Sequence, residues 1–255
     1  MRIATWNVNS LKVRLPHVLT WLAEHQPSIL ALQELKIPIN DFPADEFLTA
    51  GYHAAVFGQK TYNGVAILAK TNELTDPQLG MPNFNDEQSR VLAVTYQGVR
   101  IIDVYVPNGE SVESEKYQYK LRWCDALKAY LKEEMAMHPK LVLLGDFNIA
   151  PDDIDVHDPK RWRGKVLFSE QERAEFQAWL SLGLYDCFRQ LSPEQKAFTW
   201  WDYRLQAYPR KWGLRIDHVL ATKAMLATCK KCVIDEAPRT WERPSDHAPV
   251  MAEFT

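Results

Sequence analysis

The sequence has few of the features that mark secreted, membrane-spanning or zinc-binding proteins. It contains four cysteines in 255 residues, and only Cys229 and Cys232 stand close enough in the chain to share a metal ion. A zinc site would need a second pair or nearby histidines, and the flanking residues supply neither. We therefore expect reduced thiols near a strand, which is typical of a reducing compartment.

Long apolar runs and a strong net charge are also missing. No run approaches the length that crosses a bilayer, and polar residues interrupt the first apolar segment, so we expect no signal peptide, no membrane association and a cytoplasmic location. The net charge of −3 argues against a protein that coats DNA through charge alone. It leaves room for an enzyme with an acidic site and local basic patches.

No Gly/Ser linker, repeat or low-complexity stretch divides the chain, so a single domain over 1–255 is the simplest interpretation. Hairpins mixed with separate helices favour an α+β layered fold, and two packed sheets with helices outside would fit. Ser10 is a plausible N-cap of the first helix. The pattern predicts helices over 10–25, 115–137 and 170–182, and strands over 2–8, 28–33, 52–57, 64–69, 90–97, 99–106, 141–145, 197–201, 215–221, 230–235 and 248–254.

Polar side chains stand at or near the ends of several apolar strands. Such positions often gather at one rim of a sheet and form a pocket. The residues are Asn7, Glu34, Asp146, Asn148, Asp217, Asp246 and His247.

Four carboxylates in one pocket would repel one another and raise each other's pKa values. A hard divalent cation removes that conflict, and oxygen ligands without cysteine favour Mg²⁺, with Mn²⁺ as the alternative. Mg²⁺ takes few protein carboxylates, so spare acids remain for proton transfer to or from water. The pattern therefore predicts phosphoryl transfer without a Ser or Cys nucleophile.

Each of these residues also has a simpler interpretation. Glu34 could be a surface carboxylate paired with Lys36, Asp146 and Asn148 could form an Asx-turn, and Asp217 could be exposed. The joint arrangement, with polar sites following successive apolar segments, favours the functional interpretation.

Six motifs along the chain resemble those of a known family. TWNVNSL, LQELK, YVPNGE, LLGDFNIAP, GLRIDHVL and PSDHAPV look like the successive motifs of the exonuclease III family of AP endonucleases, within the endonuclease/exonuclease/phosphatase superfamily. The resemblance implies a four-layered α/β sandwich with two packed β-sheets between helical layers. It also implies hydrolysis of DNA at an abasic site or a 3′ end, leaving a 3′-hydroxyl, as an AP endonuclease, a 3′-phosphodiesterase or a 3′-5′ exonuclease.

The resemblance also implies roles for individual residues. Glu34 would bind the metal with support from Asn7, and Asp246 would contact it directly or through water. Asp146 would activate the attacking water and be held by Asn148. Further catalytic or phosphate-contacting positions are Tyr105, Asn108, Asp217 and His247.

The expected partner is double-stranded DNA with abasic or 3′-blocked sites, bound by a monomer. Basic residues suit phosphates and aromatic residues suit exposed sugars or bases. The segment 116–123 also mixes basic and aromatic residues, but we expect it to be a helix with a solvated basic face rather than a contact with DNA. Leu167 could narrow the sugar pocket and favour 3′-end trimming over internal incision. The predicted contacts with DNA are Lys36, Arg90, Trp200, Trp212, Leu214 and Arg215.

Two other functions stay open from the sequence. A superfamily phosphatase that acts on small phosphoesters would share GDFN and SDHAP but should lack the tryptophan-rich loops. A DNA-binding protein with a decayed active site would be expected to have lost catalytic residue types, and none is missing here.

Overall fold

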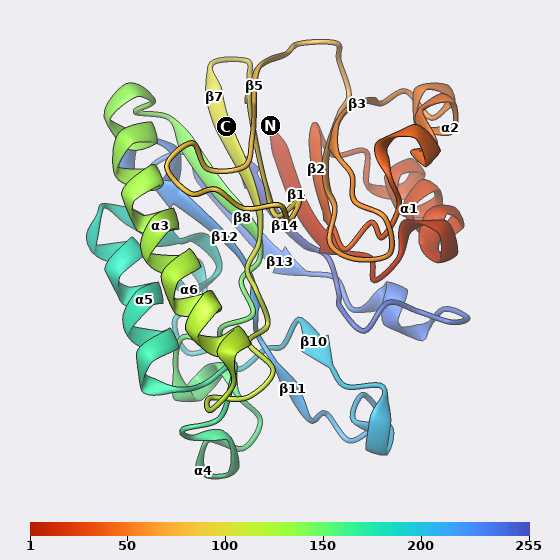
Figure 1. The fold of residues 1–255 in the computed structure, drawn as a ribbon. Coiled ribbons are helices and arrows are strands. Elements are labelled where there is room, and N and C mark those ends of the chain that lie inside the picture. The colour runs from red at the N-terminus through yellow and green to blue at the C-terminus, as the bar shows by residue number, and fades with distance from the viewer.

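Two six-stranded mixed sheets lie face to face, with helices on both outer sides, in a computed structural model that describes residues 1–255 (Figure 1). The predicted four-layered sandwich is therefore confirmed. The first sheet has the order β13-β14-β1-β2-β4-β3, and the second has the order β5-β6-β7-β8-β12-β9. The strands of the first sheet are β1 (Arg2–Asn7), β2 (Ile29–Gln33), β3 (His53–Phe57), β4 (Val65–Ala69), β13 (Cys229–Ile234) and β14 (Val250–Phe254).

The second sheet carries the other long strands, and a two-stranded ribbon lies beside both sheets. Only β1 with β2 and β7 with β8 run parallel, and all other pairs are antiparallel. The strands are β5 (Leu74–Leu79), β6 (Val91–Tyr96), β7 (Val99–Tyr105), β8 (Leu141–Asp146), β9 (Leu184–Asp186) and β12 (Asp217–Thr222), with β10 (Trp200–Trp201) and β11 (Gly213–Leu214) in the ribbon.

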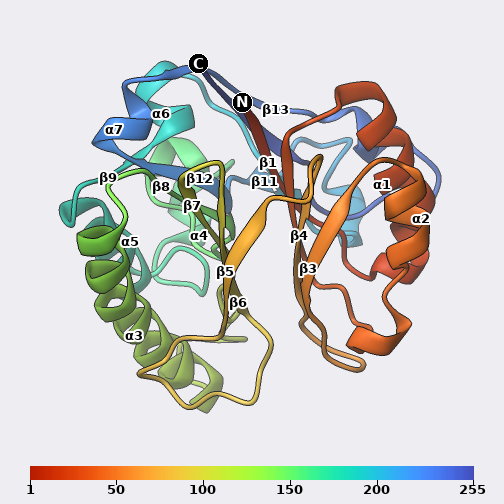
Figure 2. The ribbon, with the colours of Figure 1, turned by 90° about the horizontal axis from the view of Figure 1, so that it is seen from above.

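Helices cover the outer face of each sheet, as the view from above shows (Figure 2). The helices α1 (Leu11–His25) and α2 (Ala44–Thr49) lie beside the first sheet, and α3 (Glu115–Met137) and α5 (Glu170–Ser181) lie beside the second. The shorter helices are α4 (Pro159–Trp162), α6 (Cys187–Leu191) and α7 (Lys223–Leu226), with 3-10 turns η1 (Ile39–Asp41), η2 (Asp153–Asp155), η3 (Arg204–Gln206) and η4 (Ala237–Thr240).

Three apolar cores hold the layers together. The largest joins residues of both sheets, such as Ile29 and Val142, because alternate side chains of each strand point to the inner face. A second core packs Leu143 of β8 against α3 and α5, and a third packs Leu30 of β2 against Trp21 of α1. Burial of both faces explains why the central strands are almost uninterrupted apolar runs.

The strand register brings polar residues of distant segments to one rim. Asp146 at the end of β8 pairs with Tyr105 at the end of β7 and with Asp217 at the start of β12. In the facing sheet, Asn7 at the end of β1 pairs with Gln33, directly before Glu34.

Several local predictions need correction. Ser10 precedes α1, but it has φ 88° and its side chain makes no capping hydrogen bond. Strand β5 escaped prediction because its sequence, LTDPQL, lacks apolar alternation and contains a proline. Both features suit an edge strand that is mostly exposed and carries a bulge.

The predicted basic face of α3 is also partly wrong. Lys120 is fully buried and forms an ion pair with Glu172 of α5, and Tyr117 and Trp123 are buried beside it. One side of the segment therefore joins α3 to α5, while Lys116 and Arg122 face solvent as expected.

All four cysteines are free, and Cys229 and Cys232 lie on β13, as predicted. None of the helices combines the length and the apolar character that crossing a lipid bilayer requires.

Candidate active site

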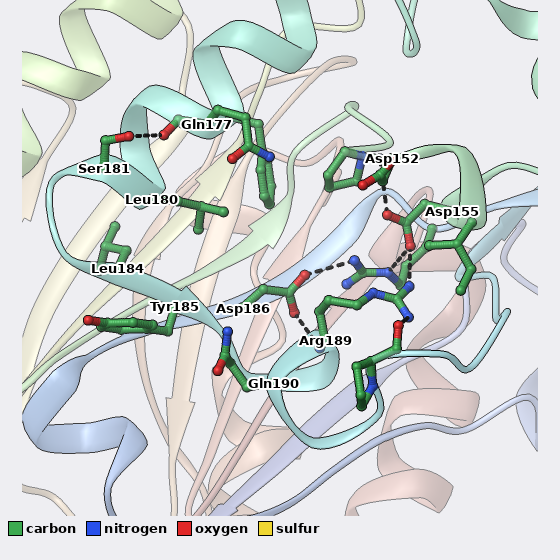
Figure 3. Close-up of a pocket in the computed structure, with 15 residues that line it drawn as sticks. Asp152, Asp155, Gln177, Leu180, Ser181, Leu184, Tyr185, Asp186, Arg189 and Gln190 are labelled. Atoms are coloured by element: carbon green, nitrogen blue, oxygen red, sulfur yellow. Dashed lines mark hydrogen bonds and ion pairs between the residues drawn. The ribbon is translucent and has the colours of Figure 1, made fainter.

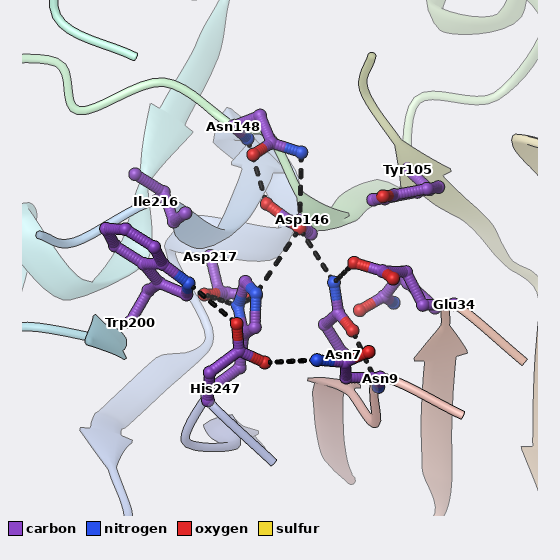
Figure 4. Close-up of polar contacts among 12 residues, drawn as sticks. Asn7, Asn9, Glu34, Tyr105, Asp146, Asn148, Trp200, Ile216, Asp217 and His247 are labelled. Carbon is purple, nitrogen blue, oxygen red and sulfur yellow. Dashed lines mark hydrogen bonds and ion pairs between the residues drawn. The ribbon is translucent and has the colours of Figure 1, made fainter. Parts of the chain in front are cut away.

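Two carboxylates and one imidazole form the centre of the polar rim (Figure 4). The carboxylate of Asp217 lies 2.9 Å from Nδ1 of His247, and Nε2 of the same ring lies 3.7 Å from Asp146. All three side chains are buried, with at most 4% of their surface exposed. The predicted pairing of Asp217 with His247 is therefore present, and His247 stands between two acids.

Burial and charge shift the pKa values of this group strongly. Burial raises the pKa of Asp146 to about 7, against the opposing effect of His247. Burial alone would lower the pKa of His247, but Asp217, Asp146 and Asp246 together raise it to about 10. The imidazole is consequently a cation at neutral pH, and it compensates the carboxylates around it.

The backbone around Asp146 holds its carboxylate in one orientation. The amide N–H of Asn148 donates to Oδ1 of Asp146 at 2.9 Å, and the Asn148 side chain lies 3.3 Å from Oδ2. Asn148 has φ 48°, and its side chain also donates to the carbonyl of Val106. Asp146 and Asn148 thus form an Asx-turn, and this turn orients the Asp146 carboxylate within the cluster.

Glycine is required at position 145, directly before this aspartate. Gly145 has φ 143°, and a Cβ atom there would lie 1.9 Å from the carbonyl oxygen of Val104 on β7. The close approach of β7 and β8 places Tyr105 next to Asp146. Burial raises the pKa of Tyr105, helped by Glu34 and Asp146, so its hydroxyl stays protonated.

Asn7 links the two sheets at this rim. Its Nδ2 donates to Glu34 at 2.9 Å and to Asp146 at 2.8 Å. A ring nitrogen of His247 and carboxylate oxygens of Glu34 and Asp146 lie within 4.8 Å of one another, and the two carboxylates could hold a metal ion while the imidazole is a cation. Lys36 also forms an ion pair with Glu34 at 2.9 Å, so the expected DNA contact and the expected metal ligand are neighbours.

Asp246 lies beside this group but has other partners. Its carboxylate accepts one hydrogen bond from Nδ2 of Asn9 and another from the indole N–H of Trp200, both at 2.9 Å. Asn9 also contacts Lys36 and was not among the residues predicted for the site. Its place in the TWNVNSL motif, two residues after Asn7, is the signal that could have revealed it.

A polar groove of about 770 Å³ opens next to the rim. Asn108 and Arg90 line it together with Tyr119. Arg90 is 9% exposed, stacks over the ring of Tyr105 at 4.7 Å and donates to the Tyr105 carbonyl at 3.1 Å. Asn108 is exposed and reaches Asn148 at 3.2 Å. Both residues therefore connect the groove to the acid cluster.

Trp200 and Leu214 face each other across the β10–β11 ribbon, and they pack with Leu167. Leu214 is fully buried and Leu167 is 4% exposed, so the apolar space beneath Trp200 is filled by side chains of the protein itself. Trp212 is half-buried, with His157 stacked at 6.0 Å and Arg210 over its ring at 4.6 Å.

Arg215 is not a surface DNA contact, which corrects the prediction. Its guanidinium is 1% exposed and forms ion pairs at 2.7 Å with Asp155 and Asp186. These residues lie at a separate pocket of about 410 Å³ beside α5 (Figure 3). The sequence shows that Arg215 is basic and close to a motif, but its depth depends on Asp155 and Asp186, which come from other segments of the chain.

Acids, an imidazole cation and oriented amides around one open rim are the parts of a phosphoester hydrolase that uses water as its nucleophile. A family model described as the endonuclease/exonuclease/phosphatase family matches residues 4–247. The chain belongs to this superfamily and, within it, to the exonuclease III / AP endonuclease family.

Individual relatives agree with this placement. Exodeoxyribonuclease III of Haemophilus influenzae is 36% identical, with 100% of both chains covered. The structure of the 3′ phosphatase NExo from Neisseria with a product DNA hairpin is 51% identical, covers 100% of this chain and 99% of its own, and has a TM-score of 0.98. An AP endonuclease from Archaeoglobus fulgidus is 38% identical, with the same coverage and a TM-score of 0.96. The chain is accordingly a nuclease of the exonuclease III / AP endonuclease type.

Proposed function

We propose that this nuclease is a Mg²⁺-dependent enzyme that clears blocked 3′ ends of double-stranded DNA in preference to incising internal abasic sites. The observation that carries the preference is the packing of Leu167 against Leu214. A base-free sugar that is flipped out of a duplex needs a pocket, and here Leu167 helps to fill the space beside Trp200. The Neisseria relatives, which are a 3′ phosphatase and a 3′-5′ exonuclease, support this proposal.

The loop that carries Leu167 is firmly held. The backbone N–H of Leu167 donates to the Glu172 carboxylate at 2.9 Å, and the Leu167 carbonyl accepts from the N–H of Ala150 at 2.8 Å. Leu167 has φ 73°, a conformation that costs energy for a leucine and is kept where the surroundings fix it. The backbone at Leu167 is therefore fixed, and the side chain is 4% exposed and packed with Leu214.

At the rim, Asp146 is placed to accept the proton of the attacking water, because Asn148 fixes its carboxylate and burial raises its pKa to about 7. The His247 cation, held by Asp217, offsets the charge that develops on the scissile phosphate. Asn108, which lines the groove, and the protonated hydroxyl of Tyr105 add hydrogen-bond donors.

The donor set fits Mg²⁺, or Mn²⁺ as the alternative, because oxygens of Glu34 and Asp146 converge with no cysteine nearby. Asp246 would contact the cation directly or through water, and the Asn7 amide would support the site. When bound, the cation supplies Lewis-acid stabilisation of the phosphoryl oxygens. We further propose that the protein acts as a cytoplasmic monomer.

Three labelled duplexes test this function, with an internal abasic site, a 3′-phosphate and an undamaged 3′ end, each incubated with Mg²⁺ and with EDTA. We expect the 3′-phosphate to react fastest, the internal abasic site slowest, and EDTA to stop every reaction. Incision of the abasic site as fast as removal of the 3′-phosphate would contradict the proposal.

Leu167→Gly tests the role of the Leu167 side chain. Removal of the side chain opens the pocket, and glycine accepts the positive φ without strain, so we expect the abasic-site rate to rise about tenfold. Gln97→Gly, in the β6–β7 turn at φ 50°, is the matched control for added backbone freedom and should leave all three rates unchanged.

A further inference from the structure

Arg239 is a buried arginine whose charge faces aromatic rings instead of a carboxylate. It lies on η4 and is 6% exposed. Its guanidinium carbon stands 4.8 Å from the ring centroid of Tyr208, 5.7 Å from that of Trp201 and 5.9 Å from that of Tyr203. Its Nε–H is buried without a partner. A buried donor without a partner lowers stability, so stability alone does not account for this arginine.

The same guanidinium reaches the turn that carries His247. Nη1 of Arg239 donates to the carbonyl of Ser245. The Ser245 hydroxyl donates to the carbonyl of Asn7 at 2.7 Å and accepts from the N–H of His247 at 3.2 Å. Ser245 thus ties two site residues from distant segments together, and Arg239 holds Ser245.

The aromatic rings around Arg239 belong to a segment that is bonded to this same turn. The N–H of Trp201 donates to the carbonyl of Asp246 at 3.1 Å, and the hydroxyl of Tyr203 donates to the carbonyl of Pro244 at 2.8 Å. Between Trp201 and Tyr208 the chain exposes Arg204 and Leu205, which line a pocket of about 180 Å³ together with Trp200 and Trp212. Arg239 therefore contacts both the turn that carries His247 and the partly exposed 201–208 segment.

We propose that Arg239 is a positioning residue that fixes the Ser245–His247 turn and the 201–208 segment as one unit. It touches neither the acid cluster nor the groove, and it acts through the Ser245 carbonyl and the three rings. Without it, the turn could shift relative to Asn7, and His247 would lose its alignment with Asp146. The inference rests on the nuclease function of this site.

Two variants test the role of the Arg239 cation, because both keep an N–H donor and only one keeps the charge. Arg239→Gln removes the cation from the rings, and we expect kcat for 3′-phosphate removal to fall about 10- to 100-fold, because small misplacements of catalytic groups cost this much. KM should change less than about threefold, since the groove is intact. Arg239→Lys keeps a cation and a donor, and it should restore kcat to within about fivefold of the original protein.

Arg100→Gln is the matched control. Arg100 is also buried, at 4% exposure, and its ion pair with Glu134 lies at the opposite end of β7 from Tyr105. Folded fractions of all variants are measured by circular dichroism at the assay temperature, and kcat is expressed per folded molecule. The control should unfold more easily but keep its kcat.

An unchanged kcat per folded molecule in Arg239→Gln would overturn the inference, as would a loss that Arg239→Lys fails to restore at all. Inactivity of the original protein on the 3′-phosphate would count against the proposed substrate preference instead. The variants are then compared on whichever of the three duplexes the original protein cuts, so the two failures remain distinct.

Discussion

Two buried histidines in this protein, His247 at the rim and His218 behind it, have opposite charge states. Both are almost fully buried, with 4% and 1% exposure. Carboxylates raise the pKa of His247 to about 10, whereas burial and Arg215 lower that of His218 to about 4. The sign of the neighbouring charge therefore decides whether burial yields a cation or a neutral ring.

The partners of His218 also define its tautomer. Nη1 of Arg215 lies 3.0 Å from Nδ1 of His218, and arginine can only donate, so Nδ1 accepts. Nε2 then carries the proton and donates to the carbonyl of Ile149 at 3.0 Å. At the rim, Nδ1 of His247 faces an acid and so must carry a proton. In the His218 cluster, the charges of Arg215 and its acid partners compensate one another. The His247 cluster leaves anionic groups that a bound cation can balance.

The strand register explains how neighbours in sequence join different clusters. Asp217 and His218 are adjacent on β12, and successive side chains of a strand point to opposite faces. Asp217 therefore meets His247 between the sheets, and His218 packs against Phe147 and Phe176 near α5. A one-residue slip would exchange the two environments.

The largest expected effect comes from Asp146→Asn at the rim. The amide cannot accept the proton of water, so we expect kcat to fall by about 10³-fold or more, with DNA binding nearly unchanged. Single-turnover cleavage and fluorescence anisotropy measure the two quantities. Asp152→Asn, an exposed acid, serves as the control. Near-normal turnover by the Asp146 variant would refute its role as the base.

Arg215→Gln tests the compensated cluster. Without the guanidinium, Asp155 keeps its ion pair with Arg189, whereas the buried Asp186 loses its arginine partner, which should cost about 3–5 kcal/mol of unfolding free energy. Urea unfolding gives this value. Arg163→Gln removes a solvent-exposed ion pair with Asp153 and should cost less than about 1 kcal/mol. Equal losses of unfolding free energy in the two variants would show that burial does not make the Arg215 ion pairs more important for stability than the exposed Arg163 pair.

Asp217→Asn should make the environment of His247 more like that of His218. Loss of the nearest carboxylate lowers the pKa of His247, and we expect kcat to fall about 10²-fold or more as the ring loses its orientation. An NMR titration of the His247 ring follows the pKa. A ring that still titrates at its original value would mean that Asp146 and Asp246 suffice to hold its charge.

The smallest effect concerns acid stability and His218. In the unfolded chain this histidine binds a proton near pH 6.5, but in the folded protein only near pH 4. Between these values the unfolded state binds more protons, so stability falls as the pH falls, by up to about 1.4 kcal/mol per pH unit. His218→Gln can keep both hydrogen bonds without titrating. Urea unfolding between pH 7 and pH 4 should therefore show a shallower decline in the variant, and parallel curves would assign the acid loss to other groups.

The long helices and hairpins follow their local sequence patterns, so the patterns predicted them well. The helix predicted over 115–137 matches α3, and the predicted hairpin over 90–106 matches β6 and β7. Other segments depart from their local pattern because contacts with distant residues decide their structure. Strand β5 is held by pairing with β6 despite a proline, and Lys120 is buried because Glu172 of another helix meets it.

The sequence by itself determined which chemical groups are available and that they follow apolar strands, because side-chain type and strand periodicity are local properties. Only the tertiary structure decided which of them meet, since register and depth depend on contacts between distant segments. Asp146 and Asp217 became neighbours through the pairing of β8 with β12. Arg215, basic and close to a motif, was placed inside the molecule, where two acids compensate its charge.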